Sequence, residues 1–218
     1  MIGHASCHGC MYSGHPHNED CPEAMGNKYK PVDGVAPTAY YPLSELFRYL
    51  PEEKRDAFEK LLDDHRSLFY AAKGSSKNHQ AWEGGYISHV VETMNIAKWL
   101  YRTSPRRLSF TLAEALEVMF LHDLEKPWKH VADVIVKHEM PQLATKEQRR
   151  NFRNDLIQQY EIQLSPAQEN ALRYVEGVPD SEYTPHERTM NELAAFCHCC
   201  DILSARLWFD KGTEGVWE

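Results

Sequence analysis

The sequence contains no apolar run as long as a membrane span, and no segment in which apolar and polar residues alternate as in a half-buried strand. Basic residues are in the minority, since 24 Lys and Arg stand against 32 Asp and Glu and leave a formal net charge of −8. This acidity argues against a broad nucleic-acid-binding face, although a local basic patch is compatible with it. The first residues also lack the positive region and apolar core of a signal peptide. We therefore expect a cytoplasmic protein without membrane segments, whose six cysteines are thiols or metal ligands rather than disulfides.

The chain divides into two parts by composition and periodicity. Residues 1–43 are rich in Gly, Pro and His and have little periodicity, so we expect an irregular N-terminal segment there. From residue 44 onward apolar residues recur at spacings of three and four, as in the stripe from Phe58 to Phe69, which is typical of helices packed on one face. Residues 44–218 therefore predict an all-α helical bundle that is long enough to bury a core.

Four segments of the form Ser/Thr-x-x-Glu/Gln are capping boxes, which mark the first turn of a helix. They begin at Thr111, Thr145, Ser165 and Thr184. The first of them opens an apolar segment that ends in a His-Asp pair.

This pair, His122-Asp123, follows the apolar run 118–121, where an imidazole and a carboxylate need partners once they are buried. Their nitrogen and oxygen atoms are also ligands for zinc, iron and manganese. Two further groups of this kind lie on predicted helices, His89 beside an apolar face and Asp201 on an apolar stripe. One shared metal ion would explain all four residues together.

The last two residues also have simpler interpretations. His89 could be a core histidine that is hydrogen-bonded to a carbonyl group, and Asp201 could form a buried salt bridge with Arg206 or Arg188. A motif match is a hypothesis, so these interpretations stand beside the metal site.

The order His, His-Asp, Asp resembles that of the HD-domain superfamily of metal-dependent phosphohydrolases. His79, followed by Gly-Gly and His89, is similar to the family's first ligand motif. Residues 121–126, Leu-His-Asp-Leu-Glu-Lys, are similar to its signature, which usually has Gly at the position of Glu125. The resemblance covers roughly residues 65–210 and implies an HD-type helical bundle.

The resemblance implies one divalent transition metal, such as Mn, Fe, Co, Ni or Zn, as the cofactor. The metal ligands that the resemblance implies are His89, His122, Asp123 and Asp201. Such a metal polarises a phosphoryl oxygen and lowers the pKa of a bound water, which is the chemistry of phosphoester hydrolysis. Asp123 would act as a bridging or orienting carboxylate at the metal, and Lys126 would hold a phosphate group of the substrate. His79 would donate a hydrogen bond to the substrate or protonate the leaving group. The simpler interpretations are a solvated lysine at a helix C-terminus and a surface histidine.

We expect one metal rather than two. Two-metal members of the family carry extra histidines between the His-Asp pair and the last Asp, and His130 and His138 are available for this. However, residues 171–177 contain no histidine where the two-metal pattern often has a His pair before Gly, and His186 comes nine residues later. This departure also weakens the alternative of an HD-type di-iron oxygenase, which needs more ligands.

The N-terminal segment holds a second candidate metal site. Cys7 and Cys10 have the spacing of structural zinc ligands, and any two of His15, His17 and Cys21 would complete a tetrahedron. A structural zinc would explain how so irregular a segment folds. The alternative is a flexible tail with incidental thiols.

The function that we predict is hydrolysis of a small phosphorylated substrate, in the first place a nucleotide, by metal-activated water. The acidic composition argues against nucleic acid as the partner. The alternatives are the di-iron oxygenase and a catalytically silent HD binding module, and the intact metal-ligand residues argue against silence. Substrate identity and oligomeric state do not follow from the sequence.

Overall fold

The computed structural model describes residues 41–75, 79–129 and 143–208, and within these ranges every regular element is a helix. The all-α prediction is therefore confirmed for this part of the chain. Outside the described residues lie His130, His138 and the predicted N-terminal zinc ligands Cys7, Cys10, His15, His17 and Cys21.

The elements follow one another as short and long helices, including a 3-10 turn (η2) and a π-helical turn (η3). In chain order they are α2 (Leu43–Leu46), η2 (Phe47–Tyr49), α3 (Glu52–Asp64), α4 (Arg66–Ala71), α5 (Gly85–Thr103), α6 (Leu112–Leu121), α7 (Lys126–Lys129), α9 (Lys146–Gln159), α10 (Pro166–Tyr174), α11 (Glu192–Leu203) and η3 (Ser204–Trp208).

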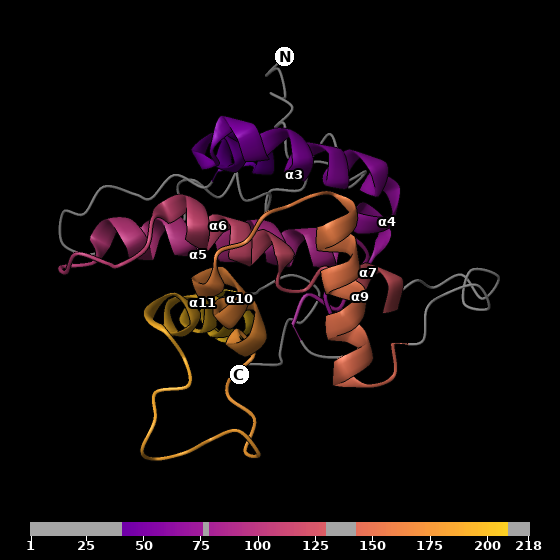
Figure 1. Cartoon of the computed structure of the whole chain (residues 1–218). Helices are drawn as coiled ribbons and strands as arrows, with labels where there is room; N and C mark the ends of the chain where they lie inside the picture. The colour runs from indigo at the N-terminus through magenta and orange to yellow at the C-terminus, as the bar shows by residue number, and fades with distance from the viewer. Residues whose placement is uncertain (1–40, 76–78, 130–142, 209–218) are drawn as a thin grey trace.

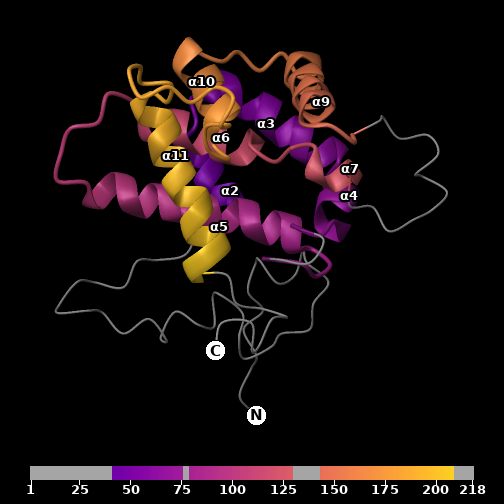
Figure 2. The same ribbon diagram turned by 90° about the horizontal axis from the view of Figure 1, so that it is seen from below.

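Helices α5 and α6 form the centre of the molecule. They pack along each other, with α10 and α11 packed on one side and α3 lying on the other (Figure 1). Seen from below, α11 crosses α5 (Figure 2). The rings of Phe47 and Phe58 pack on Phe120 and join η2 and α3 to α6. Contacts between Trp128 and Phe152 join α7 to α9 at one end of the bundle.

Helix α6 is largely apolar and is surrounded by other helices, so that all of residues 115–121 are buried. The buried Glu117 pairs with Lys54 and Gln168. The predicted capping box of α6 is present, since Thr111 Oγ1 accepts the amide hydrogen of Glu114 and the Glu114 carboxylate accepts that of Thr111. Neither α6 nor any other described helix is both long and apolar enough to cross a membrane. The end of α6 is held inside the bundle, where it places His122 and Asp123.

Of the four predicted capping boxes, three are present and the one at Thr184 is wrong as a helix start. Thr184 Oγ1 accepts a hydrogen bond from the amide of His186 within a turn. The next helix, α11, begins only after Asn191, whose side-chain oxygen caps it. Residues 185–190 offer few apolar side chains to bury, so packing does not extend a first turn there.

Candidate metal centre

Three helices deliver predicted ligands to one point. His89 lies on α5, His122 follows the last residue of α6, and Asp201 lies in the last turn of α11. His89 Nε2 is 3.2 Å from His122 Nε2 and 3.1 Å from Asp201 Oδ1. One ligand atom from each of the three residues lies within 4.8 Å of the others. This group could hold a metal ion.

Asp123 adjoins the same group. Its Oδ2 is 3.4 Å from His89 Nε2 and 3.2 Å from His122 Nε2, and the ammonium group of Lys126 contacts the same oxygen. None of these contacts has hydrogen-bond geometry, so both oxygens of this buried carboxylate are without a hydrogen bond. Such a carboxylate is destabilising unless positive charge compensates it.

The hydrogen-bond partners of the two imidazole rings show which nitrogen of each ring carries the hydrogen. His122 Nδ1 lies 2.7 Å from the carbonyl oxygen of Met119, so it carries a hydrogen and donates it. His89 Nδ1 lies 3.0 Å from Ser204 Oγ, and Ser204 donates its own hydrogen to Glu92 Oε2 at 2.5 Å. Ser204 must therefore accept the hydrogen of His89 Nδ1. In each neutral ring Nε2 then carries a lone pair and no hydrogen, and the two Nε2 atoms face each other. Histidines that bind metals have the same arrangement.

The carboxylates make this group attract positive charge. Burial opposes a charge on His122, but Asp123 and Asp201 outweigh burial and raise the pKa of His122 to about 10. Burial opposes the charge of Asp201 as well, yet contacts with His122 and His89 hold the pKa of Asp201 well below its usual range. A proton and a divalent metal compete for such a site, because the metal requires the deprotonated ligands.

The contacts of His89 and Asp201 differ from those that their simpler interpretations require. His89 Nδ1 pairs with a hydroxyl group rather than with a carbonyl group. Asp201 pairs with the two histidines rather than with Arg188 or Arg206. The partners named in the core-histidine and salt-bridge interpretations are therefore wrong, although His89 is buried and Asp201 does pair with the two histidines.

Lys126 reaches the site through a turn that follows α6. Helix α6 ends at Leu121, and a turn over residues 122–125, not a continuing helix, brings Lys126 back onto Asp123. Burial opposes the charge of Lys126, but the Asp123 carboxylate outweighs burial and raises the pKa of the lysine. Because its ammonium group is largely buried, the solvated-lysine interpretation is wrong.

His79 lies beside the metal group, in the loop before α5. Its ring centre is 5.0 Å from that of His89, and its Nδ1 is 2.5 Å from Gln80 Oε1. Burial and the nearby His89 lower the pKa of His79. The residue is half-buried, so the surface-histidine interpretation is wrong.

The Gly-Gly turn holds this loop close to α5. Gly84 has a φ of 77°, in the left-handed region that favours glycine. A Cβ atom on Gly85 would lie 1.9 Å from the carbonyl oxygen of Gln80, so only glycine permits this approach. The turn thereby fixes Gln80, whose side-chain amide donates to Glu92 Oε2 at 2.7 Å.

Sequence reasoning missed the residues behind the ligands. Glu92 lies three residues after His89, and Ser204 three after Asp201, so helical spacing could have placed each beside its ligand. Arg153 gave no such signal because it comes from a separate helix, α9. Its guanidinium group donates at 2.9 Å to the main chain at the end of α6.

Comparisons of the chain with protein-family models, with curated proteins and with solved structures found no match in any of the three. The function of the site therefore has to follow from its geometry and chemistry.

Proposed function

We propose that this chain is a metal-dependent phosphohydrolase of the HD type and that its substrate is a small phosphorylated molecule, a nucleotide. In this proposal one divalent transition metal is bound by His89, His122, Asp123 and Asp201. The observation that carries the proposal is the pair of Nε2 atoms, 3.2 Å apart and flanked by two carboxylates. Groups of this kind at such distances require a proton or a metal cation among them, and a divalent metal replaces the proton when it binds.

The donor set fits a single metal. Imidazole nitrogen and carboxylate oxygen suit Mn, Fe, Co, Ni and Zn, and both rings already keep their hydrogen on Nδ1, away from the ligand atoms. The described residues contain one such group of ligands, whereas His130 and His138, the candidate ligands of a second metal, lie outside them.

A divalent metal bound there supplies Lewis acidity to a phosphoryl oxygen and to a water molecule. Lys126 places a positive charge beside Asp123, where it offsets the negative charge that builds on phosphoryl oxygens in the transition state. His79 donates its Nδ1 hydrogen to Gln80 Oε1, because the Gln80 amide nitrogen is turned to Glu92. His79 Nε2 is then free to orient a water or to accept its proton. Donation to the leaving group, the role expected from the sequence, would require the protonated ring.

Elemental analysis of the purified chain, followed by a phosphate-release screen, tests the proposal. The screen covers nucleoside mono-, di- and triphosphates with each of the five metals. We expect stoichiometric metal and phosphate release in the wild type, and loss of both in His122→Ala. The control is His186→Ala, an exposed histidine in the loop before α11.

Equal metal content in His122→Ala and His186→Ala would contradict the proposal that His122 binds the metal. Oxygen-dependent turnover without phosphate release would contradict the hydrolase and support the di-iron oxygenase.

A further inference from the structure

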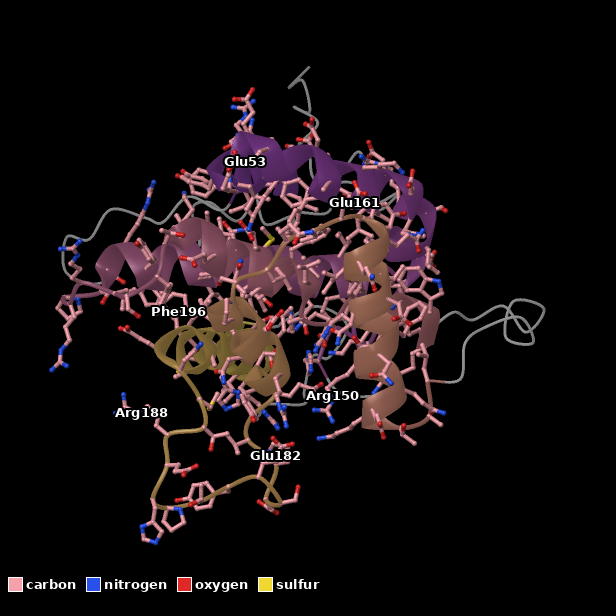
Figure 3. The ribbon with its side chains drawn as sticks, in the orientation of Figure 1. Glu53, Arg150, Glu161, Glu182, Arg188 and Phe196 are labelled. Carbon is pink, nitrogen blue, oxygen red and sulfur yellow. The ribbon has the colours of Figure 1, made fainter. Side chains whose placement is uncertain are left out.

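A basic pocket lies where the end of α6 meets α9 and α10. Its walls carry five cationic side chains: Lys146, Arg149, Arg150 and Arg153 from α9, and Arg173 from α10. Two carboxylates, those of Glu125 and Glu176, also line it, which leaves a formal charge of +3 on its walls in a chain whose net charge is −8. Figure 3 shows Arg150 between α9 and α10, and Arg188 well away from it.

The four cations of α9 share one face of that helix. From Lys146 they follow at positions i+3, i+4 and i+7, a spacing that places like charges next to one another and destabilises a helix. Lys146 is also the first residue of α9, where the helix dipole disfavours a cation. An anion in the pocket would offset both effects.

Most of these cations have no carboxylate partner. Arg173 pairs with Glu182 at 2.9 Å, but within the part of the chain that the structure describes no ion pair engages the four cations of α9. Arg149 and Arg153 donate to main-chain carbonyl oxygens instead. Arg153 is 7 % exposed, and its buried Nε has no hydrogen-bond acceptor. The walls therefore hold donors that no acceptor of the described chain satisfies.

His122 belongs both to this pocket and to the metal group. Its Nε2 faces His89 and Asp201, while its main-chain oxygen accepts a hydrogen bond from Arg153. His122 is the one predicted metal ligand that lines the pocket, and Glu125 lies beside it. The pocket and the candidate metal centre therefore adjoin each other at the end of α6 and share this residue.

We propose that this pocket binds a di- or triphosphate group and that this group belongs to the substrate hydrolysed at the metal centre, an assignment that rests on the proposed function. Guanidinium groups match phosphate oxygens with paired hydrogen bonds, and three arginines on one helix face provide several such pairs. A single phosphate group carries about two negative charges at most. It would leave part of the positive wall unmatched, whereas a chain of phosphates matches it.

Direct binding tests the pocket without the need for activity. Tripolyphosphate is titrated by calorimetry into the full chain as purified, in the wild type and in Arg150→Gln. Arg150 has no hydrogen bond or ion pair in the described chain, so its replacement leaves the packing of α9 intact. We expect the affinity to fall by on the order of tenfold, as for loss of a bidentate charged contact. Arg188→Gln, an exposed arginine away from the pocket, should bind as the wild type does.

Equal affinity for tripolyphosphate in Arg150→Gln and Arg188→Gln would overturn the proposal that this pocket binds phosphate groups. Thermal melting of both variants checks that each is folded, and Lys146→Gln, an exposed position on the same face, gives a second measurement.

Steady-state kinetics distinguishes the substrate's own phosphates from a separate anion. We expect Arg150→Gln to raise KM for a nucleoside triphosphate by on the order of tenfold, and to raise KM for the monophosphate by a smaller factor. Unchanged KM values, with tripolyphosphate altering monophosphate hydrolysis without competing, would assign the pocket to a separate anion and overturn the substrate assignment. Loss of tripolyphosphate binding in Arg150→Gln, in a protein that hydrolyses no nucleotide, would support the anion pocket and contradict both the proposed function and the substrate assignment that rests on it.

Discussion

His89 and His122 differ in what holds each ring in place. His122 is held locally, because its Nδ1 donates to Met119, three residues earlier in the same chain segment. His89 depends on Ser204, which lies 115 residues further along the chain and is itself fixed by Glu92. The orientation of His89 therefore rests on a tertiary contact that one substitution removes.

Ser204→Ala takes away the acceptor of His89 Nδ1 and frees the ring to turn. We expect metal affinity to fall by about tenfold to a hundredfold, as is usual when the hydrogen-bond partner of a ligand is lost. Titration calorimetry with zinc and with manganese measures the change. Ser181→Ala, an exposed serine between α10 and α11, is the control, and equal affinities in the two variants would show that Ser204 does not position the ligand.

Lys126→Met removes the charge that stands against Asp123. We expect kcat for phosphate release to fall by on the order of tenfold to a thousandfold, as for removal of one electrostatic stabiliser, with metal content unchanged. Lys129→Met, an exposed lysine on the same short helix, should leave kcat unchanged. If Lys126→Met turns over as fast as the wild type, Lys126 does not stabilise the transition state and serves only to neutralise Asp123.

Among the helices, the stripe from Phe58 to Phe69 forms two elements rather than one. Helices α3 and α4 meet at His65, whose ring packs edge-on against Trp128 of α7 at 4.8 Å. His65 Nε2 also lies 3.0 Å from the hydroxyl group of Tyr160, at the end of α9. Apolar spacing does not reveal this break, because α3 and α4 bury the same stripe on either side of it.

The junction at His65 makes stability depend on pH. Burial lowers the pKa of His65 below its ordinary 6.5; Asp64 opposes this effect and Lys60 adds to it. Tyr160 stays neutral, since burial and Asp64 raise its pKa to about 12. The unfolded chain then binds the proton more readily than the folded chain, so the free energy of unfolding falls as the pH drops below 6.5.

Urea unfolding of the wild type and of His65→Gln, at about pH 7.5 and about pH 5.5, measures this effect. The glutamine keeps a polar partner for Tyr160 but does not titrate. We expect the wild type to lose more stability than the variant over this range. Parallel losses would assign the pH dependence to the other histidines of the chain.

The sequence predicts features whose causes lie within a few neighbouring residues better than features that depend on tertiary contacts. The capping box at Thr111 is complete within four residues, so the sequence contains it, whereas the one at Thr184 lacks apolar residues after it and starts no helix. The convergence of the two histidines and Asp201 was predicted mainly from the resemblance to the HD-domain superfamily, because polar groups on apolar helix faces need buried partners but do not have to share one. The basic face of α9 gave no such signal, because a row of charges is an ordinary solvated face until α10 lies beside it.

For the whole molecule, the metal group joins three helices that are distant in sequence. A metal that binds only the folded chain stabilises it by about 2.7 kcal/mol at a hundredfold excess over Kd. At ~2–4 °C per kcal/mol, this raises Tm by roughly 5–10 °C for a chain of 218 residues. Thermal unfolding with added metal and with EDTA measures the shift. His122→Ala should show none, and a shift of equal size in that variant would place the stabilising metal elsewhere.

The separation of His89 from Ser204 also sets an order of events during synthesis. At about 5–20 residues per second, the ribosome needs on the order of ten seconds to make the 115 residues between them. During that time the nascent chain presents two imidazoles without Asp201, so it has no closed set of ligands. If the group binds the proposed metal, the full set of ligands forms only after α11 has emerged and docked. A polypeptide released before α11 would then lack Asp201, and metal uptake would report that translation has reached the last helices of the bundle.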